Sequence, residues 1–155
     1  MKESQFVFAY GSNMDPAQMR ERCPESDLAW FVAEARGWQL CFPRYAPKVR
    51  KCAVGSITQR EGGSVRGVVF AISSRDIERL DRYEGSGYER IQIDVHDQQG
   101  FSHRVWTYSA TLDGPKTKKL PSSAYISLYL RGAEYFGLPK KYQESLKRIK
   151  TQQSK

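Results

Sequence analysis

Residues 65–85 have the sequence VRGVVFAISSRDIERLDRYEG, in which a strand pattern passes directly into a helix pattern. The first part, VRGVVFAI, is apolar and rich in β-branched residues, which predicts a strand. Ser73 or Ser74 can cap the N-terminus of the helix that follows, and Ile77 and Leu80 would lie on one face of it. This helix is expected to end near the Tyr-Glu-Gly sequence, so a carboxylate stands where the helix stops.

The segments on both sides of this stretch are expected to surround it with strands and helices. The predicted elements are, in chain order, a strand at 5–10, a short helix that starts at Asp15-Pro16 and ends near 24, two or three strands within 28–57, a turn at 61–64 (EGGS), strands at 88–95 and 102–110, and two C-terminal helices. Strands dominate the middle, which indicates an α+β fold with a mixed, barrel-like β-sheet flanked by helices. We expect one domain over residues 1–150 and a frayed tail at 151–155.

The C-terminal helices are predicted from a stripe of apolar residues at three- and four-residue steps. Such spacing places one face of a helix in the core. Gly137 suits the end of the first helix and Pro139 the start of the second. The residues of the stripe in the first helix are Tyr125, Leu128, Tyr129, Ala133 and Phe136.

The positive charge of the chain is concentrated in the same segment. Residues 114–155 contain ten Lys and Arg against two acidic residues and supply the whole net charge of +8. A basic segment can bind nucleic acid or anionic small molecules, or it can form a solvated helical face. We favour the solvated face, because the aromatic residues here have core-like spacing, and we expect no nucleic-acid partner.

The remaining composition narrows the class of protein. A hydrophobic share of 39% with 12% aromatics is typical of a folded globule. No apolar run is long enough to cross a bilayer and the N-terminus lacks a secretory signal pattern, so we expect a cytoplasmic protein without a membrane partner. Cys23, Cys41 and Cys52 form no CxxC pair, and His96 and His103 are too few for a three-histidine site. We therefore expect no disulfide, no metal and no cofactor.

The first candidate for chemistry is Tyr10-Gly11-Ser12-Asn13, between a predicted strand and a predicted helix. Glycine lets the backbone turn sharply and approach a ligand closely. Successive backbone N–H groups in front of a helix favour an anion, such as a free carboxylate. Ser12 is a poor candidate for a nucleophile, because the GxSxG elbow is absent and no partner His and acid are evident.

The second candidate is Glu84, in the sequence LDRYEGSGY at 80–88. Its carboxylate falls where the helix ends, beside glycines that leave room for a ligand. Asp81 lies three residues earlier and would share its helix face. The alternative is that both carboxylates pair with surface cations such as Arg82 or Arg90.

Three blocks together resemble the γ-glutamylcyclotransferase family in order and spacing, over almost the whole chain. They are FAYGSN near the N-terminus, GVVFAISSRDIERLDRYEG in the middle and GAEYFGLPKKYQESL near the end. The chain looks more like the γ-glutamyl-amino-acid branch than the shorter γ-glutamylamine branch. The glutathione-specific branch usually has YGSL and a nearby Trp, whereas this chain has YGSNMD.

The resemblance implies a site, which can be assigned position by position. Glu84 matches the catalytic acid and base. Tyr108, in VWTYSA, and Tyr125, after PSSA, match tyrosines of the family's pocket, although each could equally be core packing. The expected substrate-binding residues are Val7, Phe8, Ala9, Tyr10, Gly11, Ser12, Asn13, Tyr108 and Tyr125.

The implied reaction converts a γ-glutamyl amino acid or related γ-glutamyl compound to 5-oxoproline and a free amino acid or amine. This is a transferase or lyase type of cyclisation that belongs to glutathione metabolism, with a small-molecule substrate and, by resemblance, a homodimer. Two alternatives stay open. One is a non-catalytic binding module that uses the basic C-terminal helices. The other is a cyclotransferase for a γ-glutamylamine or a specialised metabolite.

Overall fold

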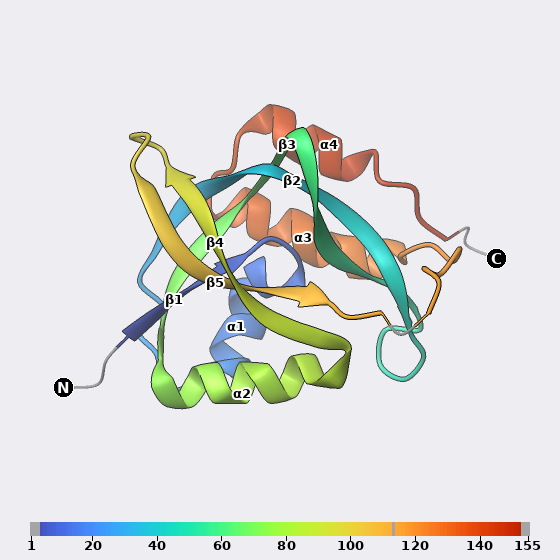
Figure 1. Cartoon of the computed structure of the whole chain (residues 1–155), viewed down its shortest axis with the longest axis horizontal. Coiled ribbons are helices and arrows are strands. Elements are labelled where there is room, and N and C mark those ends of the chain that lie inside the picture. The colour runs from blue at the N-terminus through green and yellow to red at the C-terminus, as the bar shows by residue number, and fades with distance from the viewer. Residues whose placement is uncertain (1–3, 113, 153–155) are drawn as a thin grey trace.

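The computed structural model describes residues 4–112 and 114–152, which form a closed barrel with helices packed around it (Figure 1). The strands in this part of the chain are β1 (Ser4–Ala9), β2 (Trp30–Ala46), β3 (Cys52–Ser73), β4 (Tyr88–Asp97) and β5 (Ser102–Ala110). The helices are α1 (Pro16–Arg22), α2 (Ser74–Glu84), α3 (Ser123–Tyr135) and α4 (Lys140–Lys147), with short 3-10 turns η1 (Ser12–Met14) and η2 (Gly85–Gly87). None of the helices described here is long and apolar enough to span a membrane.

The strand order around the barrel is β1-β3-β2-β4-β5, and β5 returns to β1. Neighbouring strands are antiparallel except at the closure, where Val7 of β1 pairs with Trp106 of β5 in parallel. The Thr107 hydroxyl supports this closure by donating to the Phe8 carbonyl at 2.8 Å. The α+β fold with a mixed, barrel-like sheet flanked by helices is therefore confirmed.

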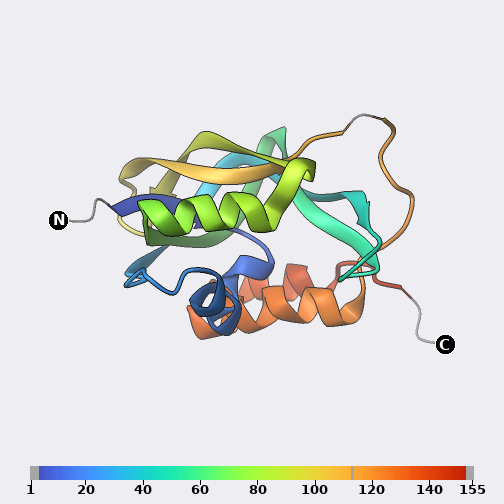
Figure 2. The same cartoon turned by 90° about the horizontal axis from the view of Figure 1, so that it is seen from below.

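The second half of strand β1, Val7–Ala9, is apolar because both of its faces are buried. Successive side chains of a strand point to opposite faces. Phe8 and Tyr10 join a core cluster made of strand and strand-end residues, which fills the barrel. Val7 and Ala9 join a second cluster, which includes the helix residues Leu80 and Tyr129 and packs the helices onto the barrel. Figure 2 shows α1, α3 and α4 on one side of the barrel, with α2 along another. The segment after β1 thus emerges between strands and helices.

The helix ends around this segment follow from local sequence signals. The Asp15 carboxylate accepts from the Gln18 backbone N–H at 3.2 Å, with Pro16 as the first residue of α1. The Ser73 hydroxyl, rather than that of Ser74, accepts from the Asp76 N–H and caps α2. Helix α2 ends at Glu84, as predicted, and Gly85 follows with a φ of +72°.

Two strands begin within residues 28–57, as predicted, but the turn at 61–64 and the separate strand that was expected from Val65 are wrong. Strand β3 continues to Ser73, and β2 and β3 form one long antiparallel pair that includes the EGGS sequence. Arg36 pairs with Ser64 and Trp38 pairs with Gln59, so the extra residues form a bulge. Gly62 adopts a φ of +76° in this bulge. The glycines therefore bend the strand without reversing it.

The end of the chain returns to the barrel. Tyr125, Tyr129 and Ala133 of α3 are buried, and Gly137 has a φ of +69° after this helix, as its C-terminal cap requires. The backbone N–H of Gln152 donates to the Pro121 carbonyl at 2.9 Å. Residues 153–155 of the predicted frayed tail lie outside the described part of the chain.

Candidate active site

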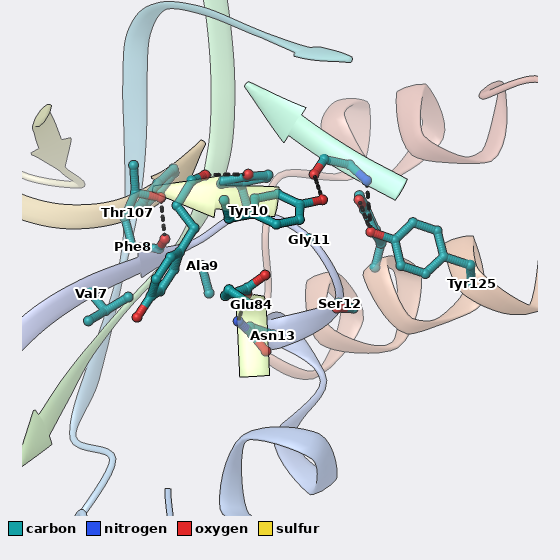
Figure 3. Close-up of a pocket in the computed structure, with 14 residues that line it drawn as sticks. Val7, Phe8, Ala9, Tyr10, Gly11, Ser12, Asn13, Glu84, Thr107 and Tyr125 are labelled. Atoms are coloured by element: carbon teal, nitrogen blue, oxygen red, sulfur yellow. Dashed lines mark hydrogen bonds between the residues drawn. The ribbon is translucent and has the colours of Figure 1, made fainter. Parts of the chain in front are cut away.

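An inner cavity of about 50 Å³ lies where the end of β1, the end of α2 and the start of α3 meet (Figure 3). All ten residues that the sequence predicts for the site line this cavity. β1 and the loop after it supply seven of them, α2 supplies Glu84, β5 supplies Tyr108 and α3 supplies Tyr125. The full lining is Val7, Phe8, Ala9, Tyr10, Gly11, Ser12, Asn13, Gly55, Glu84, Tyr88, Thr107, Tyr108, Tyr125 and Tyr129.

Glu84 and the loop after β1 are in direct contact. The Asn13 side-chain amide donates to Glu84 Oε1 at 3.2 Å, across 71 positions of sequence, and Figure 3 shows the two side chains next to each other. The side-chain oxygen of the same amide, Asn13 Oδ1, accepts from Gln18 Nε2 at 3.0 Å and from Arg22 Nη1 at 2.9 Å. Because two donors occupy that oxygen, the amide nitrogen is turned toward Glu84. Helix α1 thus sets the orientation of the contact.

The environment of Glu84 favours its protonated form. Burial raises the pKa of the carboxyl group above its ordinary value, because a charged carboxylate loses solvation there. The positive charges of Arg22 and Arg50 and the hydrogen bond from Asn13 oppose this increase, and the negative charge of Asp81 adds to it. Burial is the largest of these effects, so the carboxyl group holds a proton at higher pH than a free glutamate.

Asp81 and Glu84, three residues apart on α2, have different partners. Asp81 Oδ1 accepts from Arg90 Nε at 3.0 Å and from the Tyr108 hydroxyl at 2.6 Å. The alternative of a surface ion pair therefore holds for Asp81. Glu84 forms no ion pair with any residue that the structure describes. Its carboxylate stays available to a ligand in the cavity.

Tyrosine hydroxyls and Gly55 form a connected wall. The Tyr88 hydroxyl donates to the Gly55 carbonyl at 2.7 Å, and the Gly55 N–H donates to the Tyr125 hydroxyl at 2.9 Å. The Tyr125 and Tyr129 hydroxyls are 3.0 Å apart. A Cβ atom at Gly55 would overlap the Tyr129 hydroxyl, so only glycine fits between these rings. The Tyr10 hydroxyl donates to the Tyr108 backbone carbonyl at 2.6 Å.

The loop after β1 offers neutral donors. Within residues 4–112 and 114–152, no acceptor is found for the backbone N–H groups of Gly11 and Ser12. The Ser12 hydroxyl accepts from Gln18 Nε2 at 3.1 Å. This partner is an amide, which cannot act as the general base that a serine nucleophile needs.

Four lining residues fall outside the set that the sequence predicts for the site. The sequence gives a partial indication for two of them. Tyr88 follows the glycines after Glu84, and Tyr129 belongs to the apolar stripe of α3. Gly55 appears in the sequence only as an interruption between predicted strands. Thr107 lies in an ordinary strand pattern. Nothing local distinguishes the last two, because their roles depend on distant neighbours.

An outer groove of about 530 Å³ adjoins the inner cavity. Both are lined by Ser12, Glu84, Tyr88 and Tyr125, which therefore form their common wall. Three arginines, Arg22, Arg44 and Arg50, line the groove but not the cavity.

Comparisons with known proteins agree with this architecture. The AIG2-like family model matches residues 64–146. The chain is 32% identical to the γ-glutamylcyclotransferase of Mus musculus over 99% of this chain and 82% of that protein. It is 33% identical to the Homo sapiens γ-glutamylcyclotransferase over 96% of this chain and 80% of that protein. A solved γ-glutamyl cyclotransferase structure superposes with a TM-score of 0.90 at 30% identity, over 98% of this chain and 91% of the other. The chain belongs to the γ-glutamylcyclotransferase family and is an enzyme of this type.

Proposed function

We propose that this enzyme converts a γ-glutamyl amino acid, or a related γ-glutamyl compound, to 5-oxoproline and the released amino acid or amine, with Glu84 as acid and base. The observation that carries the proposal is the contact between the Glu84 carboxylate and Asn13, at 3.2 Å, in a cavity lined by the Tyr10–Asn13 loop. An acid–base group and an anion seat then face the same small space.

The reaction is an intramolecular transfer that uses no outside nucleophile. The α-amine of the substrate attacks its own γ-carbonyl carbon and forms a five-membered lactam. The original amide C–N bond breaks. The attacking ammonium nitrogen gives up two protons as it becomes the lactam N–H, and the leaving nitrogen takes up two protons and departs as an ammonium. A cavity that holds the substrate folded can supply much of the rate, since well-oriented intramolecular reactions gain roughly 7–11 kcal/mol.

Glu84 would handle the proton. The α-amine is an ammonium near neutral pH and cannot attack until it loses a proton. A free glutamate is a poor base for an ammonium, so the raised pKa of Glu84 brings its proton affinity closer to that of the amine. The same carboxyl group can then donate this proton to the leaving nitrogen.

The loop after β1 would hold the substrate's α-carboxylate. The N–H groups of Gly11 and Ser12, which have no acceptor among the described residues, supply donors without placing a further cation beside Glu84. Such a cation would favour the ionised carboxylate and lower its pKa. Tyr10, Tyr88 and Tyr108 would enclose the aliphatic part of the γ-glutamyl group.

Replacement of Glu84 tests the proposal. Glu84→Gln keeps the shape of the side chain and removes its ability to exchange a proton, so kcat for 5-oxoproline release should fall by about 10²–10⁴. The measurement is lactam release from a panel of γ-glutamyl compounds by mass spectrometry, with circular dichroism to show an intact fold. Turnover at the wild-type rate in a folded Glu84→Gln variant would refute the assigned role.

A cytoplasmic location, a place in glutathione metabolism and a homodimeric state stay predictions from the sequence and its resemblance. The absence of a nucleic-acid partner is also still a prediction.

A further inference from the structure

The outer groove is the natural place for the leaving group. The inner cavity is small, and its common wall with the groove contains Glu84, the group that would donate a proton to the leaving nitrogen. A substrate with its γ-glutamyl part in the cavity therefore has its scissile bond at this wall. Whatever follows the bond extends into the groove, which has about 530 Å³ of space.

The groove is lined by an excess of positive charge. Arg22 is the last residue of α1, Arg44 lies near the end of β2, and Arg50 lies in the turn between β2 and β3. Among the described residues that line the groove, Glu84 is the only acidic one. None of the three arginines forms an ion pair with a carboxylate of the part of the chain described here. Glu84 is therefore the single acidic group in the described lining that can offset the charges of three arginines, and its charge interacts with those of Arg22 and Arg50.

Each arginine is nevertheless held in place by a neutral acceptor. Arg44 Nη1 donates to the Thr111 carbonyl at 3.3 Å, and its guanidinium lies against Gly87, where a Cβ would overlap it. Arg50 Nη2 donates to Gln18 Oε1 at 2.8 Å, and its guanidinium lies 5.3 Å from the centre of the Tyr125 ring. A guanidinium has five N–H donors, so donors remain for a ligand. All three side chains are half-buried, which lowers the entropic cost of ordering them on binding.

We propose that the outer groove binds leaving groups with more than one carboxylate, and that the preferred substrates are γ-glutamyl compounds of acidic amino acids, such as γ-glutamylglutamate and γ-glutamylaspartate. This inference rests on the proposed function. A planar guanidinium binds one carboxylate through two parallel hydrogen bonds. The α-carboxylate of an ordinary amino acid would occupy one arginine and leave the others uncompensated. A second carboxylate on the leaving group matches the remaining charge, whereas a γ-glutamylamine offers none.

The discriminating substrates are γ-glutamylglutamate and γ-glutamylglutamine, which have nearly the same shape and differ by one charge. Wild-type kcat/KM should be at least about tenfold higher for the acidic compound, mainly through a lower KM. This preference should weaken as salt is added, because ions screen partly exposed charge pairs.

Arg44 is the most suitable arginine to vary, because it binds a backbone carbonyl and does not hold Asn13. Arg44→Gln should reduce the preference for γ-glutamylglutamate over γ-glutamylglutamine several-fold, and Arg44→Lys should restore part of it. The matched control is Arg20→Gln, which removes the same charge from an exposed position of α1 that lines neither the cavity nor the groove. The ratio between the two substrates should not change in this control.

Equilibrium binding separates this inference from the proposed function. Calorimetric titration of Glu84→Gln with the same two compounds measures charge recognition without turnover. Tighter binding of γ-glutamylglutamate, lost in the Glu84→Gln/Arg44→Gln double variant, supports the inference. Equal affinities, no binding of either compound, or a preference that survives loss of both Arg44 and Arg50 would overturn it. Failure of every γ-glutamyl compound to release 5-oxoproline from the wild type would instead refute the proposed function.

Discussion

The inner cavity and the outer groove share a wall but are lined by different kinds of group. In the cavity, tyrosine hydroxyls and the peptide groups of Gly55 bond to one another, and no basic residue belongs to the described lining. The groove is larger, and three arginines line it. The cavity is built to fit one neutral or zwitterionic group closely, whereas the groove offers charge and space to a variable group.

The separation of the two linings also affects the acid–base chemistry. A cation inside the cavity would stabilise the ionised form of Glu84 and make it a weaker base. At their actual positions, Arg22 and Arg50 lower the pKa of Glu84 only in part, and burial still raises it overall. The groove can therefore attract an anionic leaving group while the pKa of the Glu84 carboxyl group in the cavity stays above its ordinary value.

After Glu84→Gln, the largest effect is expected from a change that fills the cavity wall. In Gly55→Ala, the new methyl group would overlap the Tyr129 hydroxyl and break the links from Tyr88 and Tyr125. Overpacking of this kind costs about 1–3 kcal/mol of stability. Misplacement of the wall should lower kcat/KM by roughly 100-fold, because small displacements of positioning groups have large effects on rate.

Gly114→Ala is the control for this variant, since nothing lies within 4 Å of a Cβ at Gly114. Its unfolding free energy should stay within about 0.5 kcal/mol of the wild type. Thermal denaturation measures the stability of both variants, and 5-oxoproline release measures their activity. A Gly55→Ala enzyme with unchanged stability and rate would show that the wall is less rigid than its hydrogen bonds indicate.

A smaller effect is expected at Arg22, which lines the groove and whose charge acts on Glu84 in the common wall. Its charge lowers the pKa of Glu84, so Arg22→Gln should raise that pKa further. The carboxyl group would then stay protonated to higher pH. The acidic limb of the plot of kcat/KM against pH should therefore shift to higher pH. Arg20→Gln, in the same helix but away from both regions, should leave the limb in place. A limb that stays in place in Arg22→Gln, or moves to lower pH, would contradict the assignment of this limb to Glu84.

The sequence predicted the parts of the site that depend on local signals. Asp15 gave the correct start of α1, the choice between Ser73 and Ser74 bracketed the start of α2, and a glycine marked the end of α2 at Glu84. The resemblance then selected ten residues that the fold brings to one cavity. Their catalytic and binding roles remain proposals, which the variants above test.

The features that the sequence did not predict depend on contacts between distant segments. The EGGS sequence has the composition of a turn, but whether glycines reverse a strand or form a bulge depends on the partner strand, here around Gly37. Gly55 matters because Tyr129, from another element, approaches it closely. Arg44 and Arg50 belong to one groove because the β2–β3 pair brings its end to the start of β4. No local pattern contains this information.

The smallest expected effect is on stability, and it tests the burial of Glu84 without reference to catalysis. A pKa raised by folding means that the folded state binds the proton more tightly than the unfolded chain. Glu84 therefore favours the folded state most at pH below its unfolded pKa, and this contribution is lost as pH rises through the folded pKa. Glu84→Gln cannot ionise, so the variant should gain melting temperature relative to wild type at pH 7–8 and lose this gain near pH 4.

The control for the pH series is Glu144→Gln, at an exposed position of α4 whose carboxylate forms only a surface pair with Lys147. Surface pairs of this kind contribute little, so its melting temperature should follow the wild type at every pH. Melting curves of the three proteins from pH 4 to pH 8 make the comparison. If Glu84→Gln were less stable than wild type at neutral pH and equal to it in acid, the carboxylate would be stabilised by its neighbours. Glu84 would then be too weak a base for the proposed proton transfer.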